Sequence, residues 1–230
     1  MTIRPDAVLL HLAGEELHAL PSGALWWPAR RMLVISDMHL GKSERIARKG
    51  GTFLPPYETR DTLMRLSGEM DLMDPQTVLS LGDAFDDDEA AESLSGDEVL
   101  ALCRMMAPRR WVWVTGNHDP GPLPYGGEHI AAATAGPLTF RHIAEPGATA
   151  EISGHYHPKA GIGLRGGRIT RPCFLADQRR IIMPAFGTYT GGLSASAQPL
   201  QQLMSRRAVA VLTGERAVAM PMPGAARAAG

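Results

Sequence analysis

The sequence lacks several features that would place it outside ordinary folded domains. It has only two cysteines in 230 residues, too few for the disulfide framework of many small secreted proteins. No apolar run reaches the roughly 18 residues that a membrane-spanning helix needs, and the first residues show no signal-peptide pattern. We therefore expect a cytoplasmic protein that does not associate with membranes.

Neither sign of charge dominates the chain. The 23 Lys and Arg residues nearly balance the 24 Asp and Glu residues, which gives a formal net charge of −1. No global positive field would attract a nucleic acid, so a polyanion would have to be held by a local basic patch or by bound metal. The hydrophobic fraction of 44% is typical of a folded domain, and the chain is long enough to bury a core without disulfides.

Short apolar segments bounded by turn residues predict strands. They span residues 7–10, 32–35, 78–81, 111–114, 150–152, 181–183 and 208–212. Strands alternate with helical segments in the first half, which predicts a largely parallel α/β core, and glycines near residues 161–167 predict an added antiparallel portion. No repeat or linker divides the chain, so we expect one domain over residues 1–222 and a loosely held tail over 223–230.

Apolar residues at three- and four-residue spacing predict two helices. The first covers residues 57–70, with Leu63, Leu66 and Met70 on one face. The second covers residues 97–106, with Leu100, Cys103 and Met106 on one face, and Ser95-Gly96-Asp97 is a suitable start for it.

Four predicted strands end in the same way, with a metal-competent side chain directly after a small residue. Because open α/β sheets place ligands at the carboxyl ends of their strands, we expect these groups in one crevice. Each motif alone is more typical of an ordinary turn or surface loop, and only their repetition favours a shared site. Residues two apart in an extended chain point to the same side, which would pair Asp37 with His39 and His155 with His157. The four strand ends are Asp37-Met38-His39, Gly82-Asp83, Gly116-Asn117-His118-Asp119 and Gly154-His155-Tyr156-His157.

These motifs, in this order, resemble the calcineurin-like metallophosphoesterase superfamily, whose pattern also includes a single histidine, here His142. The resemblance implies an α/β fold, a four-layer α/β/β/α sandwich of two facing mixed β-sheets flanked by helices. Segments 37–42, 54–55, 171–174 and 184–187 are also similar to one bacterial subfamily, the ligase-associated DNA damage response endonucleases.

The resemblance implies a role for each matching residue. His118 would be a catalytic side chain, and Asp86 would orient it. Asp83 would bridge two divalent ions. The first ion would be held by Asp37, His39 and His157, and the second by Asn117, His142 and His155.

The chemistry of this donor set indicates which ions it would hold. Oxygen and nitrogen ligands without thiolate suit Mn²⁺, our leading expectation, with Fe²⁺ and Zn²⁺ as alternatives. Two such ions would activate a bridging hydroxide for attack on phosphorus, and His118 would protonate the leaving group. Lys42, Arg45 and His129 are weaker candidates for contacts to the substrate phosphate, because a Lys/Arg cluster is as often a solvated face.

The leading hypothesis is a phosphodiesterase that hydrolyses DNA, an endonuclease acting in DNA repair. The subfamily resemblance implies functional association with an Lhr-type helicase and a DNA ligase. A hydrolase of small phosphodiesters or nucleotides, and a non-catalytic metal-binding scaffold, remain as alternatives. The presence of His118 favours an enzyme, and the sequence does not indicate an oligomeric state.

Overall fold

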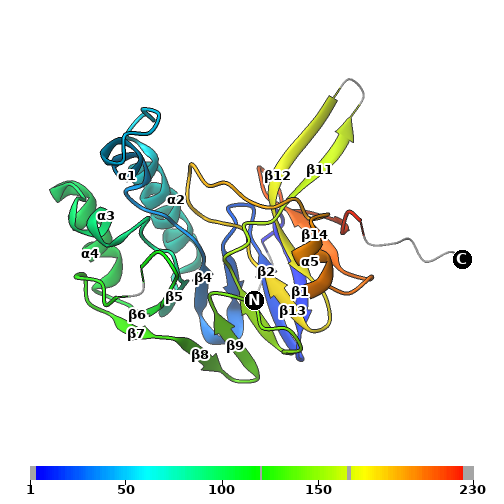
Figure 1. The fold of residues 1–230 in the computed structure, drawn as a ribbon. Helices are drawn as coiled ribbons and strands as arrows, with labels where there is room; N and C mark the ends of the chain where they lie inside the picture. The colour runs from blue at the N-terminus through cyan, green and yellow to red at the C-terminus, as the bar shows by residue number, and fades with distance from the viewer. Residues whose placement is uncertain (1–3, 120, 165–166, 225–230) are drawn as a thin grey trace, which may run out of the picture.

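The computed structural model describes residues 4–119, 121–164 and 167–224, so the end of the predicted tail lies outside the described residues. Their strands form two sheets, one of seven strands and one of eight (Figure 1). Both sheets are mixed. No helix in this part of the chain has the length and apolar character required to cross a membrane.

The first sheet has its strands in chain order. Its first four strands pair antiparallel, and from β4 onward the pairing is parallel. Parallel pairing places the carboxyl ends of β4, β5 and β6 at one edge, as predicted for three of the four motifs. The strands are β1 (Val8–Leu12), β2 (Glu15–Ala19), β3 (Leu25–Trp27), β4 (Met32–Ile35), β5 (Thr77–Leu81), β6 (Arg110–Val114) and β7 (Glu128–Ile130).

The second sheet has the order β15-β14-β12-β13-β10-β9-β8, and β11 pairs with β12 in a hairpin. The strands β9, β10 and β13 are parallel neighbours, and the other pairs are antiparallel. The strands are β8 (Ala132–Ala135), β9 (Leu138–Arg141), β10 (Glu151–Ser153), β11 (Lys159–Leu164), β12 (Gly167–Ala176), β13 (Arg180–Ile182), β14 (Val209–Leu212) and β15 (Val218–Pro221).

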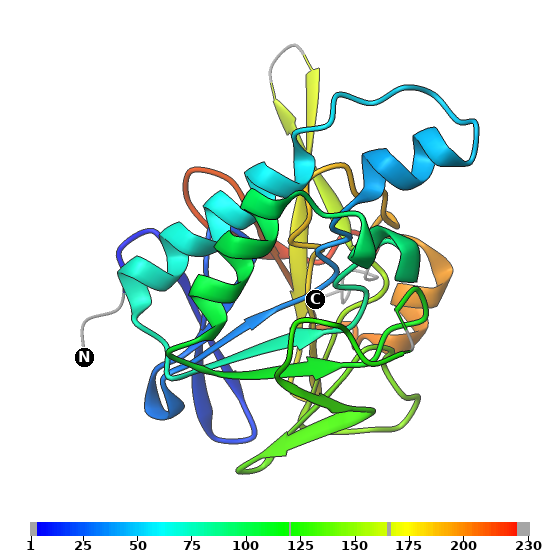
Figure 2. The same ribbon diagram turned by 90° about the vertical axis from the view of Figure 1, so that its left-hand side faces the viewer.

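The fold has four layers, helices, sheet, sheet and helix, and a hydrophobic cluster fills each of the three spaces between them. One lies between the sheets, where Trp27 of β3 and Phe140 of β9 belong to the same buried cluster. A second joins the first sheet to the helices α2 (Glu58–Met73) and α4 (Gly96–Met106), and a third joins the second sheet to α5 (Gln198–Leu203). Figures 1 and 2 show α2 and α4 together on one outer face. The predicted α/β/β/α sandwich is therefore confirmed. The short helices are η1 (Pro28–Arg30), α1 (Lys42–Arg48) and α3 (Asp88–Glu92).

The two predicted long helices are present, but only one buries all of its predicted face. In α2, Leu63, Leu66 and Met70 are buried, as their spacing predicted. The helix α4 starts at the predicted place, where Ser95 and Glu98 form a reciprocal capping box.

The predicted buried face of α4 is right only at Met106, which is buried. Leu100 is 47% exposed and Cys103 is exposed, whereas Leu102 and Met105 are buried. Apolar residues lie on more than one side of this helix, so spacing alone did not specify the face that packs on the sheet.

Candidate metal centre

Six of the seven predicted metal ligands gather into two clusters where the two sheets meet, and a third, overlapping group joins His39 and Asp83 to His118. The first cluster is Asp37, His39 and His157, and the second is Asp83, His142 and His155. Within each cluster the ligand atoms lie within 4.8 Å of one another. The seventh residue, Asn117, joins the second cluster, because its Oδ1 lies 2.9 Å from Nε2 of His142.

The two sheets are connected directly at this centre. The backbone N–H of His155, which follows β10, donates to the carboxylate of Asp37, which follows β4, at 3.0 Å from Oδ2. Within the first sheet, the N–H of Asp37 donates to the carbonyl of Gly82 at 3.2 Å. Ligands that are 118 residues apart in the chain are therefore held by short contacts.

Left-handed backbone, not extended backbone, makes the ligand pairs converge. Residues other than glycine rarely adopt positive φ, and strained conformations of this kind concentrate at functional sites. The predicted extended-chain reason for the two i, i+2 pairs is therefore wrong, although each pair does lie at the centre. The φ angles are 51° at Asp37, 46° at His39, 47° at Asp83, 70° at His155 and 45° at His157.

Glycines allow the chain to pass close to these ligands. A Cβ on Gly154 would collide with Ser36 and Asp37, and one on Gly116 would collide with Asp83. A side chain on Gly82, whose φ is 77°, would meet the ring of His142 at 2.6 Å. At all three positions only glycine allows the neighbouring segments to approach this closely.

In the second cluster a backbone carbonyl orients the histidine. Nδ1 of His142 lies 2.8 Å from the carbonyl of Leu81, so this nitrogen carries the proton and Nε2 faces the cluster. Burial alone would lower the pKa of His142, but Asp83 and Asp37 outweigh it and raise the pKa to about 9. Burial would conversely raise the pKa of Asp83, and His142 outweighs it, so the pKa falls to about 2.

In the first cluster Asp37 is completely buried. Burial disfavours its charge, but the close approach of His157 and the charges of His157 and His142 lower the pKa of Asp37 overall. Nε2 of His157 lies 3.0 Å from Oδ1 of Asp37.

The residues fit divalent metal ions. Nε2 of His39 and Nε2 of His157 are buried and have no hydrogen-bond partner, although carboxylate oxygens lie 3.9 and 3.0 Å away. Buried polar atoms are normally hydrogen-bonded, so lone pairs left facing a group of acidic oxygens indicate a site for a cation. The donors are oxygen and imidazole nitrogen, which suits Mn²⁺, Fe²⁺ and Zn²⁺ alike.

The centre is closed on one side and open on the other. Asp37, His39, Asp83 and His142 are buried, whereas Asn117 is exposed and His118, His155 and His157 are partly exposed. A substrate would therefore approach from the side of Asn117 and His118.

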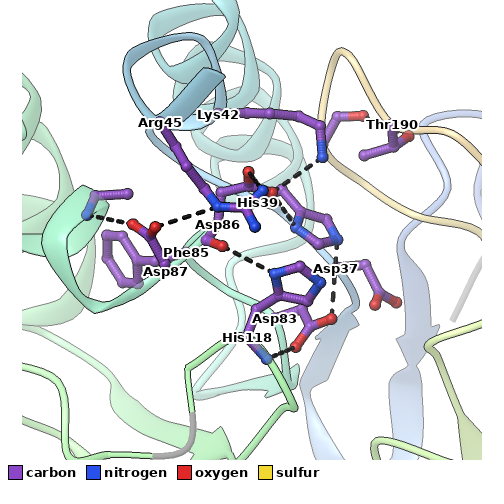
Figure 3. A network of polar contacts seen from close by, with 12 residues as sticks. Asp37, His39, Lys42, Arg45, Asp83, Phe85, Asp86, Asp87, His118 and Thr190 are labelled. Carbon is purple, nitrogen blue, oxygen red and sulfur yellow. Dashed lines mark hydrogen bonds and ion pairs between the residues drawn. The ribbon is translucent and has the colours of Figure 1, made fainter. Parts of the chain in front are cut away.

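The predicted contact between Asp86 and His118 needs correction. His118 Nδ1 donates to the backbone carbonyl of Asp86 at 2.9 Å, and the Asp86 carboxylate faces His39, Lys42 and Arg45 instead (Figure 3). The left-handed turn at Asp83 and the position of α1 decide this arrangement, and residue order does not reveal it.

The three predicted phosphate contacts lie in other environments. Lys42 and Arg45 pair with Asp86 at 3.0 and 2.9 Å, so their charges are already partnered. His129 lies on β7, where its ring stacks on Trp113 with centroids 6.3 Å apart, and it belongs to neither cluster.

Sequence reasoning missed the structural importance of Asp119. Its buried carboxylate accepts four backbone N–H groups, including those of Asp83 and Gly116 at 3.0 and 3.2 Å. It thereby joins the loop after β5 to the loop after β6. The available signal was its place in the Gly-Asn-His-Asp motif.

A sandwich of two mixed sheets with Asp and His clusters at their meeting edge defines a metal-dependent hydrolase. A family model of the calcineurin-like phosphoesterases matches residues 30–148, just over half of the chain. The chain belongs to this family and is a metal-dependent phosphoesterase. The matched segment includes the ligands from Asp37 to His142, and His155 and His157 follow it.

A solved structure resembles the whole fold. The crystal structure of Pseudomonas putida nuclease MPE aligns with a TM-score of 0.75 and 25% sequence identity, covering 92% of this chain and 100% of the other. A search of curated proteins found no match to this sequence.

Proposed function

We propose that this protein is a binuclear metal-dependent phosphodiesterase that cleaves DNA. The observation that carries the proposal is the pair of neighbouring clusters, three ligands each, with Asp83 close to both. Oδ2 of Asp83 lies 3.9 Å from Nε2 of His39 and 3.3 Å from Nε2 of His142. The likeness to a nuclease over nearly the whole chain supports a nucleic acid as the substrate, and the motif resemblance to ligase-associated endonucleases favours DNA.

Each residue of the centre has a proposed task. Asp37, His39 and His157 would hold one divalent ion, Asn117, His142 and His155 the other, and Asp83 both. When bound, two such ions supply Lewis-acid activation of water and of the phosphate oxygen. Mn²⁺ is our proposal for the ion.

His118 is the proposed general acid. Its Nδ1–H donates a hydrogen bond to the backbone carbonyl of Asp86, so Nε2 of its ring is available to exchange a proton with the leaving oxygen. The partial exposure of His118 on the open side agrees with this task.

We also propose a cellular setting for this activity. The motif resemblance to ligase-associated endonucleases supports a role in DNA repair alongside an Lhr-type helicase and a DNA ligase. Two free cysteines, one of them exposed, support a reducing compartment such as the cytoplasm.

The experiment compares three substrates with one protein. Metal-depleted protein is reloaded with Mn²⁺, Mg²⁺ or Zn²⁺ and given supercoiled plasmid, bis(p-nitrophenyl) phosphate or p-nitrophenyl phosphate, with a chelator control. We expect plasmid nicking and a preference for the diester over the monoester. The Asp83→Ala variant, purified identically, excludes a contaminating nuclease.

Other outcomes would decide against DNA. Diester cleavage with intact plasmid would assign the protein to small phosphodiesters. Metal-loaded protein without any turnover would indicate a metal-binding scaffold.

A further inference from the structure

Asp86 is a buried carboxylate with three cationic or imidazole neighbours, and it lies beside the first cluster. Its oxygens are 2.7 Å from Nδ1 of His39, 3.0 Å from Nζ of Lys42 and 2.9 Å from Nη1 of Arg45. The side chain of Asp86 is fully buried. Figure 3 shows the three partners around it, two of them from α1.

The geometry of His39 links Asp86 to the metal. The ring of His39 is 4% exposed, its Nδ1 lies 2.7 Å from Oδ1 of Asp86, and its Nε2 faces the cluster, although neither ring nitrogen makes a contact with full hydrogen-bond geometry. A carboxylate on one nitrogen of a histidine fixes its tautomer and ring orientation and increases its basicity as a ligand at the other nitrogen. We infer that Asp86 is the positioning residue of His39, holding Nε2 toward the first metal ion. This inference rests on the proposed metal assignment but not on DNA as the substrate.

Lys42 and Arg45 stabilise the ionised form of the buried Asp86 carboxylate. An ionised carboxylate out of water is costly unless it is paired and hydrogen-bonded. The two cations supply that pairing, so Asp86 stays ionised beside Nδ1 of His39. Their role is to support Asp86, which explains why they are not free to contact a phosphate.

If Asp86 acted through His118 instead, loss of its side chain would change the orientation of His118. His118 contacts the backbone carbonyl of Asp86, and replacement of the side chain leaves that carbonyl in place. Loss of the carboxylate should therefore disturb metal binding at His39 and spare the orientation of His118.

The test measures metal binding by the full chain after metal depletion. Mn²⁺ titration followed by electron paramagnetic resonance gives affinity, and the visible spectrum of bound Co²⁺ reports ligand geometry. We expect Asp86→Ala to weaken one of the two ions roughly 10–100-fold and to change the Co²⁺ spectrum. Asp86→Asn keeps an acceptor oxygen and should restore part of the affinity. If Asp86→Ala does not fold, the same Mn²⁺ and Co²⁺ measurements are made on Asp86→Asn alone.

The matched control is Asp87→Ala. Asp87 caps α3 and pairs with Arg45 and Arg48, so its loss disturbs the same loop and the same ion-pair network of α1 without touching His39. We expect wild-type Mn²⁺ affinity in this variant. If Asp87→Ala weakens Mn²⁺ as much as Asp86→Ala does, the effect belongs to the ion-pair network and the inference is wrong.

A double-mutant cycle identifies the histidine through which Asp86 acts. If it acts through His39, adding Asp86→Ala to His39→Ala causes little further loss of Mn²⁺ affinity. Adding Asp86→Ala to His118→Ala then lowers the Mn²⁺ affinity as much as Asp86→Ala does in the wild-type protein. Wild-type affinity and Co²⁺ spectrum in Asp86→Ala and Asp86→Asn, or additive losses with His39→Ala, would overturn the inference. Protein that binds two Mn²⁺ ions in this pattern but leaves DNA intact would refute the proposed function alone.

Discussion

The two ligand clusters differ in how their buried histidines are oriented. In the second, Nδ1 of His142 contacts the backbone carbonyl of Leu81, part of β5 itself. In the first, Nδ1 of His39 contacts the side chain of Asp86, which is held by two cations of α1. Main-chain support cannot be removed by substitution, whereas side-chain support can. The first cluster is therefore the one that single substitutions beyond the ligands can weaken.

The largest effect is expected from the residue that lies next to both clusters. Asp83→Ala removes a carboxylate close to His39 and His142, so we expect turnover below detection and less than one ion per chain. Bis(p-nitrophenyl) phosphate assays and elemental analysis measure both. Asp88→Ala, at the exposed first residue of α3, is the control and should behave as wild type. Retention of both ions in Asp83→Ala would contradict the bridging position.

Next in size are variants that each damage one cluster. His157→Ala should remove the ion of the first cluster, and His155→Ala that of the second, because each proposed ion has three ligands of its own besides the shared Asp83. Manganese stoichiometry by electron paramagnetic resonance should fall from two ions to about one in either variant. Loss of both ions from either variant would mean that the clusters form one interdependent site.

A smaller effect is expected from His118→Ala, which should lower turnover without lowering metal content. His118→Ala should keep both ions while turnover drops roughly 10²–10⁴-fold, the range expected when a proton-transfer group is lost. Turnover and metal content are measured on the same preparation. His118 also lies within ligand distance of His39 and Asp83, so loss of metal from this variant would show that it is a ligand.

The smallest effect concerns pH and tests the charge of the second cluster. The pKa of His142 in the metal-free protein is raised from 6.5 to about 9. A raised pKa stabilises the folded state fully below pH 6.5, and this contribution is lost as pH rises through about 9. We therefore expect the free energy of unfolding in chelator to fall by a few kcal/mol between pH 6.5 and 9.5, at about 1.4 kcal/mol per pKa unit.

Two controls check this pH dependence. The His142→Asn variant should lose it, because no imidazole remains to titrate. Mn²⁺-loaded protein should show it weakly, since a ligating histidine is neutral, and its metal affinity should rise with pH over the same range. Denaturant unfolding followed by circular dichroism measures each case. An unchanged slope in His142→Asn would assign the effect to other groups.

Much of the fold was predictable because local patterns and packing agree. The strand pattern at residues 32–35 matches β4, and the spacing of Leu63, Leu66 and Met70 matches the buried face of α2. In α4 apolar residues occupy several sides, so only contact with the sheet decides that Leu102, and not Leu100, is buried.

The sequence alone determined which residue types meet at the centre, because each ligand follows a strand end and the parallel strands share one edge. It did not determine their partners. Whether the Asp86 carboxylate faces His39 or His118 depends on the left-handed turns at His39 and Asp83 and on where α1 lies, which are set by contacts between distant segments. The same packing decided that Lys42 and Arg45 neutralise a buried charge, because a carboxylate removed from water must find cations nearby.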